Sequence, residues 1–154
     1  MQAHLVAVAI TLGLLGASSA DAQQPDRSST IARKGGVMPG NSIPEVPQEA
    51  RPFVLKRVIN IDEHTADISV TWVRIWGHHD RIVNEISDRV YYIIDGEGRF
   101  QVGDGAPIEK ASAGDFVYIP RNVPYEFDGQ MRYIVMNGPA YRTASDKVLP
   151  PVMK

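Results

Sequence analysis

The chain of 154 residues contains no cysteine. This absence excludes disulfide bonds, a thiolate nucleophile, a cysteine-ligated zinc site and a lipid anchor on an N-terminal cysteine. A metal ion in this protein would have to be held by His, Asp, Glu or Asn side chains.

A large net charge is also absent, because 16 Lys and Arg residues are balanced by 18 Asp and Glu residues. The formal net charge of −2 gives no electrostatic reason to expect nucleic acid or an anionic membrane surface as a partner. The length suits one compact domain, with little chain left for a second. We therefore expect a single-domain protein whose partner is a small-molecule ligand.

No hydrophobic run is long enough to span a bilayer easily. The apolar run Leu5–Gly16 falls short of the ~20 residues that a membrane-spanning helix needs. Small residues follow it, and Ala20-Asp21-Ala22 fits the cleavage rule of signal peptidase. We predict a signal peptide over residues 1–22 and an exported protein, periplasmic or secreted, that has no membrane contact after cleavage. A buried N-terminal helix is the alternative interpretation.

Sustained helical periodicity is absent from residue 53 to residue 137. Short β-rich runs alternate there with Gly and Asp turn signals, a pattern typical of a sandwich or barrel. The predicted strands are Phe53–Ile61, Ile68–Trp76, Val90–Asp95, Arg99–Val102, Phe116–Ile119, Tyr125–Phe127 and Tyr133–Asn137, and the predicted turns include Asp95-Gly96 and Asp128-Gly129.

Proline and glycine density divides the chain into further segments. Residues 23–52 are rich in both and predict an arm or linker, part of which is an edge strand because Ile43 and Val46 need burial. We assign residues 53–142 to the barrel. Residues 143–154 are expected to form a loose C-terminal tail.

Two frames of glycine and proline resemble the motifs of the cupin superfamily. The first frame runs from Gly77 to Gly96 and ends in SDRVYYIIDGEGRF. The second opens at Gly114 and has its proline at Pro120, in AGDFVYIPRNVPYEF. Asn122 stands where the family has glycine, and Asn tolerates the left-handed backbone region. The resemblance implies an all-β fold: a small antiparallel β-barrel or double-stranded β-helix, an RmlC-like jelly roll.

The usual metal ligands of that family are replaced in this chain. Val83 and Glu85 occupy the positions of two histidines, and Arg89 occupies that of the glutamate. Tyr125 occupies the position of the third histidine. Valine cannot bind a metal, and a protonated guanidinium repels a divalent cation. We therefore expect no metal and no cofactor in the pocket.

A displaced metal site is the alternative, with His78, His79 and Glu85 as its ligands. Adjacent histidines on a strand point to opposite faces, so both reach one ion only where the backbone is irregular. Otherwise one histidine lies at the pocket rim, where it can contact the ligand or act as a general base. We take His79 as the pocket contact.

Strand alternation orders the other pocket residues. If Arg89 faces inward, as the resemblance implies, Tyr91 faces inward too, and the frames add Glu85 and Tyr125. These four side chains and His79 are the five predicted ligand-binding residues. A buried arginine needs a partner. Arg89 either pairs internally with Glu85, receives an anionic ligand, or extends to solvent.

Several functions remain open at this point. The preferred one is a metal-free pocket that binds a small polar or anionic molecule, such as a carboxylate, a phosphate or a sugar. The alternatives are a metal-independent isomerase, epimerase or lyase with Glu85 or a histidine as base and Tyr125 or Tyr91 as acid, a metal-dependent enzyme at the displaced site, and a structural protein with a filled barrel. The resemblance also leaves a homodimer open, because many cupins dimerise through N-terminal strands.

Overall fold

The structure, a computed structural model, describes residues 35–153, and every regular element within this range is a β-strand. The described part of the chain has no helix with the length and apolar character needed to cross a membrane. The predicted signal peptide, residues 1–22, and the start of the predicted arm, residues 23–34, lie outside the described residues.

Eight strands form one sheet in the described residues, and every pairing between them is antiparallel. In chain order they are β1 (Val46–Pro47), β2 (Phe53–Ile59), β3 (Ser69–Asn84), β4 (Asp88–Val102), β5 (Ile108–Ser112), β6 (Phe116–Ile119), β7 (Tyr125–Gly138) and β8 (Asp146–Val148). The sheet order is β1-β2-β3-β7-β4-β5, with β6 beside β4 and β8 beside β3.

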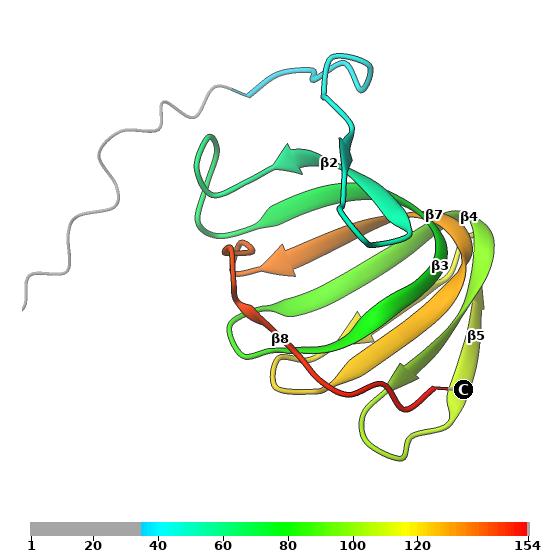
Figure 1. The fold of residues 1–154 in the computed structure, drawn as a ribbon. Coiled ribbons are helices and arrows are strands. Elements are labelled where there is room, and N and C mark those ends of the chain that lie inside the picture. Colours follow the sequence, from blue (N-terminus) through cyan, green and yellow to red (C-terminus); the bar gives the residue numbers. More distant parts are fainter. Residues whose placement is uncertain (1–34, 154) are drawn as a thin grey trace, which may run out of the picture. The chain divides into compact units, whose positions relative to one another are not determined.

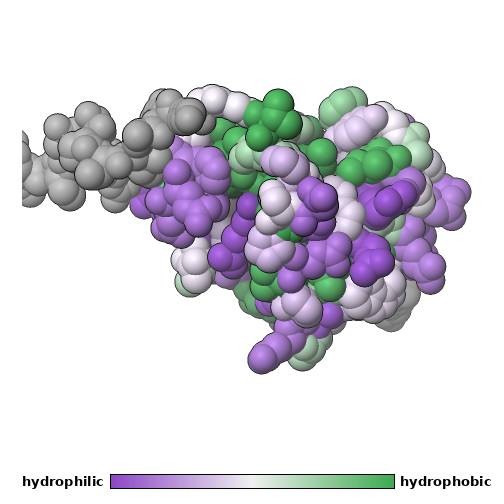
Figure 2. Space-filling view, turned by 90° about the horizontal axis from the view of Figure 1, so that it is seen from above, coloured by the Kyte–Doolittle hydropathy of each residue, from purple (hydrophilic) through white to green (hydrophobic). Residues whose placement is uncertain are grey.

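The long strands β3, β4 and β7 curve around a common interior, as Figure 1 shows. Side chains that alternate inward along them fill this interior, so the sheet closes on its own apolar face. The predicted all-β antiparallel barrel is confirmed. Its core consists of Phe53, Val73, Ile75, Ile82, Tyr91, Ile93, Phe100, Ala111, Ile119, Tyr125, Phe127, Met131 and Tyr133. On the face seen in Figure 2, apolar residues form separate patches between polar ones.

Two predicted turns are wrong, because β4 continues through Asp95-Gly96 and β7 continues through Asp128-Gly129. The glycines serve a close approach of the two strands instead. A Cβ atom at Gly96, whose φ is +76°, would lie 2.1 Å from the carbonyl oxygen of Gln130. A Cβ atom at Gly129 would lie 2.4 Å from the carbonyl oxygen of Glu97. Glycine is therefore required where β4 and β7 bend past each other.

The two ends of the described chain are more ordered than their composition indicates. The arm supplies β1, an edge strand of two residues that pairs with β2. The expected loose tail is wrong, because β8 pairs with the end of β3. The backbone N–H groups of Val152 and Met153 donate to the Glu126 carboxylate, whose residue is fully buried. Side-chain acceptors and a strand edge thus hold the tail on the barrel.

Candidate ligand-binding site

A cavity of about 150 Å³ opens at one end of the barrel. Inward-facing residues of β2, β3, β4 and β7 form its wall, and the C-terminal segment closes one side. It is lined by Gln48, Arg51, Phe53, Leu55, Arg57, Thr71, Val73, His79, Arg89, Tyr91, Tyr133, Val135, Asn137, Tyr141 and Asp146.

Strand alternation placed the β4 and β7 side chains correctly. Arg89 and Tyr91 face inward with 5% and 2% of their surface exposed, and Tyr125 on β7 is 1% exposed. Their positions follow from the two-residue period of a strand, because each lies an even number of residues from an apolar core position. Three of the five predicted ligand-binding residues therefore meet inside the barrel, and His79 on β3 lines the same cavity.

Glu85, the fifth predicted ligand-binding residue, does not face the interior, so its predicted inward position is wrong. The register between β3 and β7 shifts after the pair His79–Phe127, and the next pair is Ile82–Tyr125. The extra residue on β3 is a bulge, and it reverses which side chains face inward. Asn84 is consequently buried, whereas the Glu85 side chain is 53% exposed and accepts a hydrogen bond from Lys147 Nζ at 2.5 Å.

Arg89 is held by a carboxylate from a distant part of the chain. Its Nη2 donates to Asp146 on β8, and its Nη1 donates to the Tyr125 hydroxyl at 2.5 Å. Asn84 Nδ2 donates to the same Asp146 oxygen at 2.8 Å. The guanidinium also lies over the Tyr141 ring, 5.7 Å from its centroid. The predicted pairing of Arg89 with Glu85 is thus wrong, because Asp146 takes that role.

A pair of buried tyrosine hydroxyls continues this network. The Tyr91 and Tyr125 hydroxyl oxygens are 2.7 Å apart, so one donates to the other. Burial raises the pKa of both phenols above the ordinary value, despite the nearby Arg89 charge. Both tyrosines therefore stay protonated at neutral pH and can donate a hydrogen bond or a proton.

His79 lies among aromatic rings on the cavity wall. Its imidazole stacks on Phe127 with 4.5 Å between ring centroids and on Phe53 with 5.9 Å. Burial lowers its pKa from 6.5 to about 4, so the ring is neutral at pH 7. Nδ1 lies 2.8 Å from the Asp80 carbonyl oxygen, which can only accept. The proton therefore resides on Nδ1, and Nε2 keeps a lone pair.

His78 points to the other face of β3, as neighbouring strand residues do. Its Nε2 lies 3.5 Å from Glu126 Oε2, under the C-terminal tail. The displaced metal site is wrong in its geometry, because His78, His79 and Glu85 occupy separate places. Within residues 35–153, no group of three or more His, Cys, Asp or Glu side chains is arranged to hold a metal ion.

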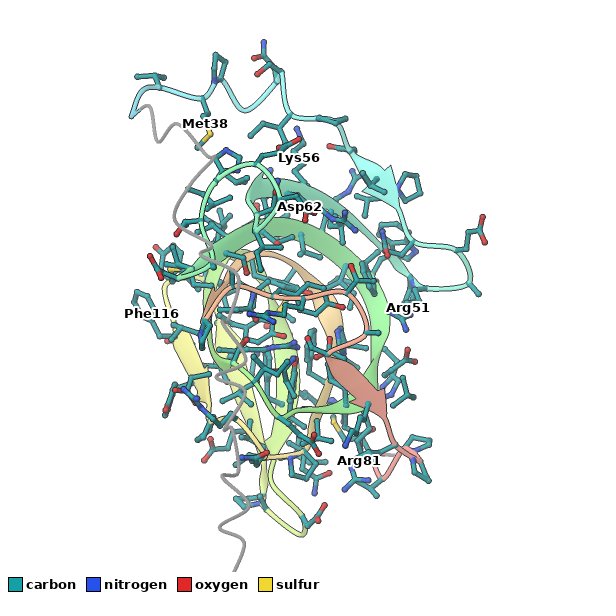
Figure 3. All side chains as sticks on the ribbon, turned by 90° about the vertical axis from the view of Figure 1, so that its left-hand side faces the viewer. Met38, Arg51, Lys56, Asp62, Arg81 and Phe116 are labelled. Atoms are coloured by element: carbon teal, nitrogen blue, oxygen red, sulfur yellow. The ribbon has the colours of Figure 1, made fainter. Side chains whose placement is uncertain are left out.

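Two more arginines line the cavity at its mouth. Arg51 precedes β2, and Arg57 lies within it on the same face as Phe53 and Leu55. In Figure 3 the labelled Arg51 lies at the edge of the barrel, whereas Phe116 lies on the outer side opposite. Because Asp146 is the only carboxylate among residues 35–153 that lines the cavity, three guanidinium groups of its lining face one carboxylate.

Sequence reasoning missed several residues of the cavity. Tyr133 and Asn137 continue the inward alternation of β7 and could have been found by extending that strand. Asp146 could not, since it lies 57 residues from Arg89 in a segment without a strand pattern. Arg57 gave no signal either, because an arginine in a short strand is usually solvated.

No protein-family model and no curated protein matches this chain. Solved structures do. Pac13 from Streptomyces, described as a nucleoside dehydratase, has a TM-score of 0.64 and 18% identity over 75% of this chain and 92% of its own. KdgF from Halomonas sp. has a TM-score of 0.59 and 17% identity, over 71% of this chain and 97% of its own. The polyketide cyclase RemF from Streptomyces resistomycificus has a TM-score of 0.64 and 15% identity, over 77% of this chain and 88% of its own. The chain therefore has the cupin fold, an RmlC-like jelly roll, and the resemblance is confirmed at that level.

Proposed function

We propose that this cupin-fold protein is exported and binds a small organic anion in the cavity, with Arg89 as the principal contact. The observation that carries the proposal is a guanidinium buried at the cavity wall and oriented by Asp146 and Tyr125. A guanidinium has five N–H donors, so these two contacts leave donors for a ligand. An arginine with a fixed orientation is suited to a carboxylate, whose two oxygens match its fork.

The electrostatics and the size of the cavity support the same ligand class. Three arginines and one aspartate line it, and His79 is neutral, so the lining carries net positive charge. An organic acid of a few carbon atoms fits the cavity of about 150 Å³.

Isothermal titration calorimetry with acetate, butyrate, succinate and inorganic phosphate tests the proposal. We expect at least one carboxylate to bind the wild type, and Arg89→Lys to weaken that binding about tenfold or more, because lysine lacks the fork. Arg132→Gln removes one positive charge from the outer surface and serves as the matched control. Equal affinities in wild type and Arg89→Lys would refute the proposal.

A metal-independent lyase is the second candidate, and His79 is the observation that favours it. Its Nε2 keeps a lone pair, its ring stacks 6.0 Å from that of Tyr125, and Tyr91 lines the same cavity. In a β-hydroxy acid, Nε2 would take a proton from the carbon next to the carboxylate, a C=C bond would form, and the C–O bond would break. The departing hydroxide would leave as water with a proton from a tyrosine.

The neighbours are consistent with this chemistry. Pac13 is described as a nucleoside dehydratase, and its variants with a tyrosine or a histidine replaced have been solved with uridine. Glu85 is removed as a base by its position outside the barrel. NMR of a β-hydroxy acid in deuterated buffer tests the candidate: exchange at the carbon next to the carboxylate should occur with wild type and stop with His79→Gln. Absence of exchange in wild type leaves binding alone as the function.

A further inference from the structure

The cavity has a second cationic region at its mouth, formed by Arg51 and Arg57. Arg57 belongs to β2, and Arg89 belongs to β4, which lies three strands further along the sheet. Both side chains nevertheless line the same cavity, because the sheet curves around it. The mouth and the inner wall therefore each present a guanidinium to one ligand.

Arg57 differs from most arginines of the described chain in its lack of an acidic partner. Arg74, Arg81, Arg99, Arg121 and Arg132 each have a carboxylate within 4.0 Å. Among residues 35–153, no Asp or Glu oxygen lies within that distance of Arg57. The nearby Arg51 forms an ion pair with Asp80, with 3.2 Å between Nε and Oδ2. The positive charge at the mouth is thus only partly compensated by the protein itself.

Tyr141 provides a second observation that the three arginines converge. Burial and Asp146 raise the pKa of its phenol, and Arg89, Arg51 and Arg57 act in the opposite direction. All three guanidinium groups therefore lie close enough to influence the same hydroxyl group. The Arg89 guanidinium is also in direct contact with that ring.

The spacing of the strands sets the distance between the two cationic regions. At ~4.8 Å per strand, the backbones of Arg57 and Arg89 are roughly 14 Å apart along the curved wall. Two long side chains that point into one cavity shorten that separation considerably. A ligand with two anionic groups joined by a short carbon chain could contact both.

We propose that Arg57, with Arg51 beside it, forms an outer anion subsite, so that the ligand of this protein is a short dicarboxylate with one carboxylate on Arg89 and the other at the mouth. The proposal rests on the anion-binding function above. It makes Arg57 the residue that selects dianions over monoanions. Arg89 contributes to the binding of both classes.

Calorimetry with succinate and butyrate tests it, since the two acids have the same number of carbon atoms and differ in one carboxylate. Wild type should bind succinate about tenfold or more tightly than butyrate, as expected for one added charged hydrogen bond. Arg57→Gln should abolish this preference and leave the affinity for butyrate within about twofold. Arg132→Gln should behave as wild type.

The outcomes separate the two proposals. If Arg57→Gln weakens both acids equally, or neither, the outer subsite is refuted while the Arg89 site stands. If neither acid binds wild type, or if Arg89→Lys leaves both affinities unchanged, the anion-binding function itself is refuted. An ionic-strength series adds a readout, because the preference for succinate should decline as salt screens the exposed Arg57.

Discussion

Two of the Arg–Asp pairs made by strand β4 lie in opposite surroundings. Arg89 points into the cavity and pairs with Asp146, and their side chains are 5% and 22% exposed. Six residues further on, Asp95 points outward and pairs with Arg132 of β7, and their side chains are 41% and 51% exposed. The chemistry is the same, and only the direction of the side chain from one strand differs.

This difference determines what each pair contributes. The outer pair is solvated and screened by salt, so it adds little to the stability of the fold. The inner pair lies in a region of low dielectric constant, where loss of one partner leaves a buried charge without its counter-ion. The inner pair also fixes a cationic group at a cavity wall, where it can recognise a ligand. The proposed function therefore uses the inward pair.

The largest expected effect is on the inner pair. Arg89→Met should lower the free energy of unfolding by up to about 3–5 kcal/mol, because it leaves the partly buried Asp146 without its cation. The double variant Arg89→Met with Asp146→Leu should recover most of this loss. Urea denaturation measures both. A loss below about 1 kcal/mol in the single variant would show that the pair is as solvated as the outer one.

The next largest effect is the pH dependence of the free energy of unfolding that His79 causes. His79 lies inside the barrel, whereas the adjacent His78 lies outside. Above pH 6.5 the His79 imidazole is neutral in both the folded and the unfolded chain. As the pH falls from 6.5 to about 4, only the unfolded chain takes up the proton, so the free energy of unfolding decreases. The decrease should reach at most about 3 kcal/mol.

Denaturation midpoints measured across this pH range, in wild type and two variants, provide the check. His79→Gln should flatten the profile between pH 6.5 and 4, whereas His78→Gln should retain it. A profile that persists in His79→Gln would assign the pH dependence to another group.

An intermediate effect is expected at Glu126, a buried carboxylate on the outer side of β7. It accepts the N–H groups of Val152 and Met153 and thereby attaches the tail. Glu126→Gln should cost about 1–2 kcal/mol, since hydrogen bonds to a neutral acceptor are weaker. Limited proteolysis should then release the C-terminal residues sooner than in wild type. Unchanged cleavage would mean that β8 alone holds the tail.

The smallest effect is expected for the outer pair. Asp95→Asn should change the free energy of unfolding by less than about 1 kcal/mol, and added salt should reduce the difference further. Denaturation at low and high salt measures it. A cost comparable to that of Arg89→Met would remove the distinction between the inner and outer pairs.

The sequence predicts the fold and the inward-facing site residues of β4, because side chains alternate regularly along that strand. Alternation in β4 is regular up to the bulge at Asp95, so Arg89 and Tyr91 are placed inward from the residues alone. Alternation fails on β3, where the bulge between His79 and Ile82 contains no glycine to signal it. The prediction for Glu85 is wrong for this reason.

Contacts between distant segments were the other part that the sequence did not reveal. Asp146 reaches Arg89 only because β8 pairs with the end of β3, and nothing in the residues 143–154 indicates that pairing. Likewise, Arg57 joins the cavity through the curvature of the whole sheet. Such contacts depend on the closed fold and leave no local pattern.

The most direct test of the anion site is heteronuclear NMR of the arginine side chains during titration with succinate. The Arg89 Nε–H group is buried and has no partner within the described residues, so its proton should exchange slowly with water and give an observable signal. We predict that this signal, assigned with Arg89→Lys, shifts in proportion to ligand occupancy while the Arg132 signal stays unchanged. Binding of succinate with no shift at Arg89 would contradict the account.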